Sequence, residues 1–403
     1  MNTKEKNRRT SKRIGILCIV CLMIIAAVAV GTVLIHHKDM REVSSDLKVD
    51  ENEQSTEMPE REQQVEDFLS NMTLEEKIYQ MFIVTPEQLT GAENVTAAGE
   101  RTKNSLKERP VGGIIYFSQN LVSADQTRTM LSNTQDYAKE LQGLPLFLSV
   151  DEEGGSVTRV AGNPAFSAES VKPMAEVTSV EEAYECGNII GGYLSDLGFN
   201  LDFAPDADVL TNSANTVIGN RSFGTDADVV TEYAAAYAKG LQANHVLSTF
   251  KHFPGHGATE ADTHEGYAYT NKTLTELEQA ELKPFAAAQQ EGVDFVMAAH
   301  ISVPNVTGDN TPCSLSETMI QILRENCGYD GIVITDAMNM GAIIRTYSAS
   351  DAAVKAVSAG VDIILMPENL EEAYSGIYDA VQNGDLSEDR IDDAVRRILK
   401  AKM

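Results

Sequence analysis

The chain has 403 residues, of which 43% are apolar and 23% are charged, so a collagenous, wholly disordered or disulfide-scaffold protein is excluded. Asp and Glu number 60 against 32 Lys and Arg, which gives a net charge of -28 at pH 7. Because an acidic surface repels phosphate backbones, we expect no nucleic-acid partner.

The N-terminal region differs from the rest of the chain in charge. Residues 1–38 carry seven basic residues and one acid, a local charge of +6, which leaves -34 for residues 39–403. Residues 14–35 are a run of 22 residues without a formal charge, long enough as a helix to cross a hydrocarbon core of roughly 30 Å. The positive-inside rule then predicts a cytoplasmic basic tail at 1–13, a transmembrane segment at 14–35 and an extracellular remainder anchored to the cell membrane.

An alternative for this segment stays open, because Ala27-Val28-Ala29 resembles the small-residue cleavage site of a signal peptide, which would give a secreted protein. Residues 36–64 are acidic and poor in large apolar residues, which is typical of a flexible linker. The folded domain is predicted to cover 65–403, and Thr73 and Glu76 have the spacing of a helical capping box near its start.

Within 65–403, eight short runs rich in β-branched or aromatic residues alternate with intervals of helical length and polarity. The predicted strands are Tyr79–Val84, Gly112–Phe117, Pro145–Val150, Leu201–Ala204, Leu247–Phe250, Phe295–Ala299, Gly331–Thr335 and Asp362–Met366. The predicted helices are Ala124–Leu141, Val180–Leu197, Asp226–Asn244, Thr275–Glu291, Leu315–Cys327 and Ser387–Lys402. This alternation predicts an α/β fold, specifically a (β/α)8 TIM-type barrel.

Polar residues follow five of the eight strands at the point where each strand ends. They are Asp151, Asp206, the segment Lys251–Gly257, His300 and Asp336. Because active sites of such barrels lie at the C-terminal ends of the strands, we expect these groups to meet in one pocket. Asp336, held by an apolar strand, suits a carboxylate nucleophile, although an Asp in this position can also cap the next helix.

The segment from Lys251 to His264 has two functional interpretations. His252, His256, Asp262 and His264 are ligand types that zinc accepts, although their spacing matches no helical two-histidine motif. Alternatively, Asp262 accepts a hydrogen bond from His264, which then acts as a general acid and base.

Five motifs together resemble glycoside hydrolase family 3, in particular its β-N-acetylhexosaminidase branch. They are Lys251–Gly257, Asp262–His264, Thr335–Met340, Asp151–Gly155 with Arg159, and Gly219–Gly224. The resemblance covers about residues 65–403, and the ordered combination of motifs is far more specific than any one of them.

The resemblance implies a retaining exo-enzyme that removes terminal β-linked N-acetylglucosamine from peptidoglycan-derived or related saccharides through a covalent glycosyl-aspartate. Carried onto matching positions, it makes Asp336 the nucleophile, His264 the acid/base and Asp262 its partner. We expect no cofactor and no metal. The residues that it assigns to sugar binding are Asp151, Arg159, Arg221, Lys251 and His252.

Three alternatives stay open at this point. A β-glucosidase or β-xylosidase of the same family is disfavoured, because the family's two-domain members take their acid/base from a following domain and this sequence ends at Met403. A non-catalytic anchored sugar-binding protein would lack Asp336 or His264, and both are present. Phosphate in place of water as the acceptor would make the protein a phosphorylase.

Overall fold

The computed structural model describes residues 60–259 and 268–403. The predicted tail and transmembrane segment, and the linker up to residue 59, lie outside the described residues, as do Asp262 and His264. Among the helices of the described ranges, none combines the length and the apolar character needed to cross a bilayer.

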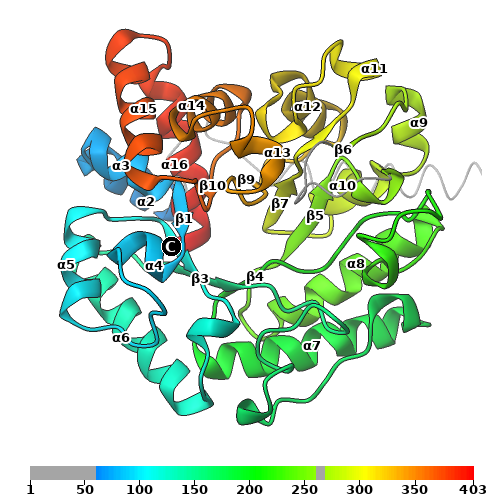
Figure 1. The fold of residues 1–403 in the computed structure, drawn as a ribbon, viewed down its shortest axis with the longest axis horizontal. Helices are drawn as coiled ribbons and strands as arrows, with labels where there is room; N and C mark the ends of the chain where they lie inside the picture. The colour runs from blue at the N-terminus through cyan, green and yellow to red at the C-terminus, as the bar shows by residue number, and fades with distance from the viewer. Residues whose placement is uncertain (1–59, 260–267) are drawn as a thin grey trace, which may run out of the picture. The chain divides into compact units, whose positions relative to one another are not determined.

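The strands form parallel sheets, as the sequence predicts. A five-stranded sheet has the order β10-β1-β2-β3-β4, a three-stranded sheet has the order β5-β7-β9, and β6 pairs with β8 (Figure 1). Single parallel bridges, Leu201 to Leu247 and Ile334 to Ile363, connect the two larger sheets at both of their ends. The strands are β1 (Phe82–Val84), β2 (Gly113–Ile115), β3 (Phe147–Val150), β4 (Leu201–Asp202), β5 (Thr249–Phe253), β6 (Ala268–Tyr269), β7 (Phe295–Ala298), β8 (Ile301–Ser302), β9 (Ile332–Thr335) and β10 (Ile364–Leu365).

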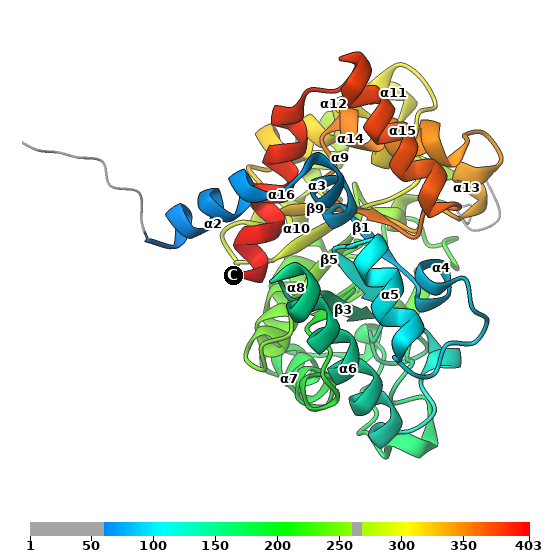
Figure 2. The ribbon, with the colours of Figure 1, turned by 90° about the vertical axis from the view of Figure 1, so that its left-hand side faces the viewer.

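The helices lie around these strands in both ribbon views (Figures 1 and 2). They are α2 (Glu60–Asn71), α3 (Leu74–Gln80), α4 (Pro86–Thr90), α5 (Glu100–Glu108), α6 (Ala124–Gln142), α7 (Val180–Leu197), α8 (Ala227–Gln242), α9 (Leu274–Gln279), α10 (Lys283–Ala288), α11 (Pro304–Thr307), α12 (Glu317–Gln321), α13 (Gly341–Ile344), α14 (Ala349–Ala359), α15 (Leu370–Asn383) and α16 (Glu388–Lys402). Alternation of strands and helices along the chain confirms the α/β class.

Helix ends were predicted best where the sequence supplies both a cap and a stop. At α7, the Ser179 side chain accepts a hydrogen bond from the Glu182 amide, and Gly198 ends the helix in the left-handed conformation. The capping box of Thr73 and Glu76 is present at the start of α3, as predicted.

Two predicted helices are wrong in their continuity. The interval Thr275–Glu291 contains two helices, because Pro284 lacks an amide hydrogen and lies in the first turn of a new helix, α10. The interval Leu315–Cys327 contains the short helix α12, followed by a wider π-turn over Ile322–Asn326.

The first described helix, α2, covers Glu60–Asn71 and buries Val65 and Leu69. The first strand begins later than predicted. The predicted strand Tyr79–Val84 begins as the end of α3, so only Phe82–Val84 pairs as β1.

Aromatic side chains fill the interior at the N-terminal ends of the strands. Phe147 and Phe295, the first residues of β3 and β7, are buried and meet edge to face with 5.2 Å between ring centroids. The amine of Lys402 lies 4.9 Å from the Phe147 ring centroid and donates to the carbonyl oxygen of Gly112 at 2.8 Å. The N-terminal ends of the strands are therefore filled by apolar side chains, and polar groups gather at the C-terminal ends.

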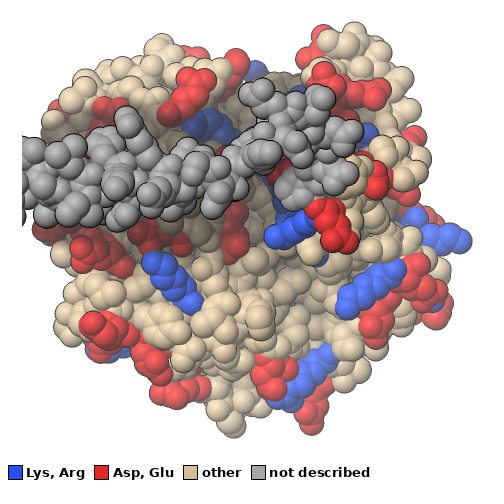
Figure 3. Space-filling view, turned by 180° about the vertical axis from the view of Figure 1, so that it is seen from behind, with Lys and Arg blue, Asp and Glu red and all other residues tan. Residues whose placement is uncertain are grey.

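The surface carries both charges. On the uncovered part of the face in Figure 3, basic side chains lie singly, several of them beside acidic side chains, among larger areas of other residues.

Candidate active site

Strand β5 places two of the predicted sugar-binding residues in the interior. The strand was predicted to end at Phe250, but it runs from Thr249 to Phe253, so Lys251 and His252 belong to it. Both side chains are buried, with exposed fractions of 2% and 7%. The prediction failed because a lysine and a histidine looked like the start of a loop, whereas here each is paired with buried carboxylates.

Glu153, which follows β3, joins two cations that come from other segments. Its Oε1 lies 2.6 Å from Lys251 Nζ, and its two carboxylate oxygens accept from Nε and Nη2 of Arg221, each at 2.8 Å. Lys251 Nζ also donates to Asp151 Oδ1 at 2.9 Å. The structure thus brings together Asp151, Arg221 and Lys251, and Glu153, which was not predicted, pairs with both of the cations.

Within this network, each charged group shifts the pKa of its partners. Burial alone would raise the pKa of Glu153, but the Lys251 and Arg221 charges lower it below its ordinary value. For Lys251 and Arg221, burial acts to lower the pKa, and the Glu153 charge outweighs it, so both pKa values are raised. At neutral pH the three groups are therefore ionised, as an ion-paired cluster that can orient the hydroxyls of a bound polar molecule.

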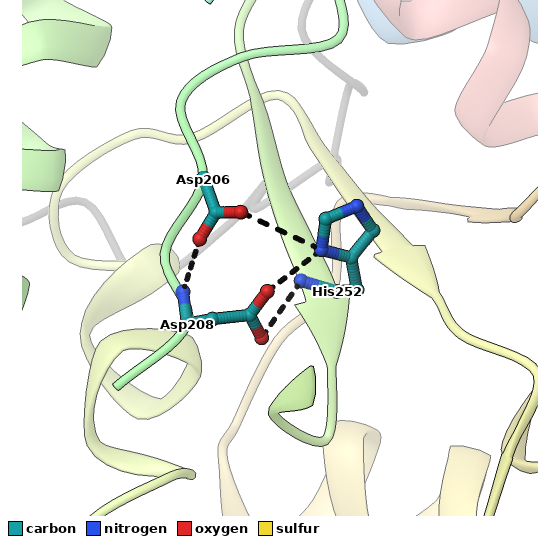
Figure 4. A group of neighbouring side chains, drawn as sticks. All are labelled: Asp206, Asp208 and His252. Carbon is teal, nitrogen blue, oxygen red and sulfur yellow. Dashed lines mark hydrogen bonds and ion pairs between the residues drawn. The ribbon is translucent and has the colours of Figure 1, made fainter. Parts of the chain in front are cut away.

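A second group consists of Asp206, Asp208 and His252 (Figure 4). His252 Nδ1 lies 2.7 Å from Asp208 Oδ2 and 3.8 Å from Asp206 Oδ2. The Asp208 amide donates to Asp206 Oδ1 at 2.9 Å, and the buried Asp206 Oδ2 has no hydrogen-bond partner within the part of the chain that the structure describes. On the other side of the ring, His252 Nε2 lies 3.4 Å from Arg221 Nη2.

Burial dominates the ionisation of this group. Burial, with the neighbouring Asp208 charge, raises the pKa of Asp206 to about 8, and burial likewise raises the pKa of Asp208. Burial and the Arg221 charge lower the pKa of His252 to about 4, against an opposing influence of the Asp336 carboxylate. The His252 ring is therefore neutral at pH 7, and Asp336 lies close enough to act on it electrostatically.

The same three side chains are the best metal-ligand set among the described residues. One ligand atom from each of Asp206, Asp208 and His252 lies within 4.8 Å of the others. However, a hydrogen bond joins His252 Nδ1 to Asp208, and the Arg221 guanidinium lies 3.5 Å from Asp206 Oδ2. A cation at this point would replace that hydrogen bond and meet a fixed positive charge, so the arrangement does not fit a metal ion.

Asp336 follows β9 and is held by its backbone. Its amide donates to the Ala298 carbonyl at 2.9 Å, and its Oδ1 accepts from the Ala337 amide at 2.7 Å. His300, after β7, fixes the same turn, since its Nε2 lies 3.0 Å from the Ala337 carbonyl oxygen and its Nδ1 lies 2.7 Å from Ser314 Oγ. The predicted nucleophile is thus half-buried at the C-terminal end of its strand, beside the turn that His300 secures.

Arg159, another predicted sugar-binding residue, lies in the loop after β3. Its guanidinium carbon is 6.0 Å from the Phe117 ring centroid, and Nη1 lies 3.5 Å from the Thr158 carbonyl oxygen. Glu152, which was not predicted, organises this loop. Its carboxylate accepts from three successive loop amides, those of Arg159, Val160 and Ala161, and from the Tyr193 hydroxyl.

The loops after β4 and β5 pack closely against each other. A Cβ on Gly257 would lie 2.2 Å from the Val209 carbonyl oxygen, so only glycine fits there. Asn215 donates to the carbonyl oxygens of His256 and Thr259 at 2.8 and 2.9 Å. His256 is buried and its amide donates to Asp208, so the first turn after β5 is fixed as far as Thr259.

Sequence reasoning missed Glu153 and Asp208 as members of the site. Both lie within or next to motifs that were noticed, since Glu153 follows Asp151 by two residues and Asp208 follows the predicted strand Leu201–Ala204 by four. Only the three-dimensional contacts identify them, namely Arg221 and Lys251 beside Glu153 and His252 beside Asp208.

Comparison with known proteins adds a family to this geometry. The Glycosyl hydrolase family 3 N terminal domain matches residues 73–401. Beta-hexosaminidase A of Pseudoalteromonas piscicida is 33% identical over 322 residues, which cover 72% of this chain and 53% of the relative. Beta-hexosaminidase LpqI of Mycobacterium tuberculosis is 36% identical over 267 residues, covering 64% of this chain and 68% of the relative.

A similar solved structure is that of a glycoside hydrolase family 3 beta-N-acetylglucosaminidase from Paenibacillus sp., with a TM-score of 0.77 and 37% identity. The match covers 82% of this chain and 62% of that chain. This chain therefore spans only part of some relatives, about half of the Pseudoalteromonas protein and three fifths of the Paenibacillus one.

Proposed function

Because this chain belongs to glycosyl hydrolase family 3, we propose that it is a retaining exo-β-N-acetylglucosaminidase. Its substrates are saccharides with a terminal, non-reducing β-linked N-acetylglucosamine, in particular peptidoglycan-derived fragments. The names of the relatives, beta-hexosaminidase and beta-N-acetylglucosaminidase, support this assignment.

The observation that carries the proposal is the position of Asp336 beside a buried polar cluster. Asp336 directly follows the last residue of β9, and its carboxylate acts to raise the pKa of His252. The His252 ring is in turn adjacent to Arg221, and Lys251 precedes it on β5. In a retaining mechanism, Asp336 attacks the anomeric carbon to form a glycosyl-aspartate, and water then hydrolyses this intermediate. Lys251 and Arg221, held by Glu153, orient the sugar, together with Asp151 and His252.

For the proton transfers we retain the assignment made from the motif. His264 protonates the leaving oxygen and then removes a proton from the attacking water, while Asp262 accepts a hydrogen bond from its ring. Hydrolysis of the intermediate regenerates the free carboxylate of Asp336, so the proposed reaction consumes no cofactor.

We also infer that β1, β2, β3, β4, β5, β7, β9 and β10 form one closed (β/α)8 barrel. The order of the two larger sheets, together with the parallel bridges at both junctions, supports closure. In such a barrel the C-terminal strand ends face one pocket, which agrees with the contacts between Asp151 and Lys251.

For localisation we propose a single-pass membrane protein with the catalytic domain outside the cell. The uncharged run at 14–35 and the basic residues before it support this topology. Membrane fractionation of the full chain tests it: the protein should resist alkaline extraction, and a variant lacking residues 14–35 should be soluble. A mature chain that begins after Ala29 would instead establish a cleaved signal peptide.

The activity is tested with the full-length chain and two substrates, an aryl β-N-acetylglucosaminide and an aryl β-glucoside. We expect release from the first to exceed release from the second, and Asp336→Ala to lower kcat by about a thousandfold or more. Asp385→Ala, which removes an exposed aspartate, is the matched control and should keep full activity.

Three results would contradict the assignment. Faster release from the glucoside would favour a β-glucosidase, and full activity in Asp336→Ala would exclude the nucleophile. Formation of a sugar phosphate when phosphate is added would favour a phosphorylase.

A further inference from the structure

We propose that Asp208 is a positioning residue, which fixes the tautomer of His252 so that the ring offers a lone pair at Nε2. The use of this lone pair as an acceptor for a sugar hydroxyl rests on the proposed function. The location of the ring proton is a property of the protein itself and can be measured without any substrate.

The first observation is the set of donors around Asp208. Its carboxylate is fully buried, and it receives the His256 amide and the His252 amide at Oδ1, the latter at 3.3 Å. Its Oδ2 lies 2.7 Å from His252 Nδ1. An ionised carboxylate can only accept hydrogen bonds, so the ring proton belongs on Nδ1.

The second observation comes from the opposite side of the ring and is independent of the first. His252 Nε2 lies 3.4 Å from Arg221 Nη2. A guanidinium has only donors, so Nε2 must present a lone pair to it. Both sides of the ring therefore demand the same neutral tautomer.

Asp206 explains why Asp208 keeps its charge. The two carboxyl groups are neighbours in a fully buried site, where two negative charges repel each other. Asp208 faces three N–H groups, whereas Asp206 accepts the Asp208 amide, and its Oδ2 has no hydrogen-bond partner among residues 60–259 and 268–403, with Arg221 Nη2 at 3.5 Å. A proton shared by the pair therefore resides on Asp206, and Asp208 stays an acceptor for the ring.

The consequence concerns how His252 contacts the sugar. The hydrogen bond from Nδ1 to Asp208 favours one ring orientation with the proton on Nδ1, so Nε2 is a positioned acceptor beside Arg221 and near Asp336. Asp208→Asn keeps the shape but offers a single acceptor oxygen to three donors, and its amide hydrogens face other N–H groups. The ring should then lose its single tautomer.

The direct test is nitrogen NMR of the full chain labelled at its seven histidines, with His252→Gln used to assign the signal. At pH 7 we expect His252 with a protonated Nδ1 and a bare Nε2. In Asp208→Asn we expect the Nε2-protonated form or a mixture, and a kcat/KM about 10- to 100-fold lower, the range typical of removing a group that orients a functional histidine.

Asp294→Asn is the matched control. Asp294 is a half-buried aspartate that also accepts several hydrogen bonds, from Gln242 and Ser248, but it precedes β7 at the other end of the strands. The Asp294→Asn substitution should lower the free energy of unfolding. The nitrogen chemical shifts of His252 should stay unchanged, and kcat/KM should stay within twofold of wild type.

The outcomes separate this inference from the proposed function. A wild-type His252 protonated at Nε2, or on both nitrogens at pH 7, would overturn it, and this measurement stands even if Asp208→Asn fails to fold. An Asp208→Asn chain that keeps both the tautomer and full activity would also overturn it. A wild-type chain with the expected spectrum but no glycosidase activity would contradict the function and support the tautomer.

Discussion

Single residues determine the electrostatics of this site. Lys251 is buried and Arg221 is partly buried, and Glu153 is the carboxylate that contacts each of them. Removing one member of a buried ion pair leaves an uncompensated charge, which costs far more than the loss of a surface pair.

Glu153→Gln should therefore lower the free energy of unfolding by about 3 kcal/mol at pH 7 and raise KM, because both cations lose their anchor. The folded-state pKa of Glu153 is lowered, so its stabilisation is fully present above the unfolded-state pKa of about 4.5 and is lost as the pH falls towards the folded-state value. Urea unfolding of wild type and of Glu153→Gln between pH 3 and pH 7 measures this pH-dependent difference in stability. Glu185→Gln, at an exposed position, should change little, and an equal loss in both variants would contradict the role of Glu153.

At this scale the sequence predicted which residues lie near each other better than it predicted their individual contacts. Lys251, His252, Arg221 and Asp336 were identified because their motifs are distinctive. Glu153 was not, since a pairing between residues that are 68 or 98 positions apart depends on the fold and leaves no local pattern.

Secondary-structure elements follow local signals where these are strong. Helix α7 begins after a serine that caps it and ends at a glycine, and its predicted bounds were correct. The interval Thr275–Glu291 was predicted as one helix because of its length and mixed polarity, but a new helix, α10, begins at its proline. Strand β5 was predicted too short, because burial of Lys251 and His252 depends on partners from β3 and β4 loops.

A cap substitution in α7 tests how much such a signal contributes. Ser179→Ala removes the acceptor of the Glu182 amide and should lower the free energy of unfolding by about 1 kcal/mol. Ser195→Ala, at an exposed position of the same helix, should leave it unchanged or slightly higher. Denaturant unfolding of the three chains compares them, and equal stabilities would show that the cap contributes nothing.

At the scale of the whole described chain, the first and last elements are in contact. Strand β1 pairs with β10, and α16 packs on α2 and α3, where Arg396 pairs with Glu66 and Lys77 with Asp392. The last helix also delivers Lys402, whose amine contacts Phe147 inside the molecule. The predicted barrel makes the first and last strands neighbours, but the side-chain pairs of α16 were not predicted, because their partners are far away in sequence.

Lys402 should make stability depend on pH. Burial lowers its folded-state pKa to about 7, whereas the unfolded chain releases this proton near pH 10.5. Between these values the unfolded state holds the additional proton, so the contribution of Lys402 to stability rises with pH and is lowest below about pH 7. Urea unfolding at pH 6 to 9 should show wild type gaining on Lys402→Met as the pH rises. Lys400→Met, at an exposed position, should show a constant difference, and a constant difference for Lys402→Met would contradict the prediction.

The pairing of β1 with β10 has a consequence for engineering. Because the ends of the described chain belong to neighbouring elements, residue 403 can be joined to residue 60 by a flexible glycine-serine peptide. New termini can then be opened in the exposed turn around Gly384 and Asp385, between α15 and α16. Such a circular permutant keeps every strand neighbour, so it should fold and keep its turnover.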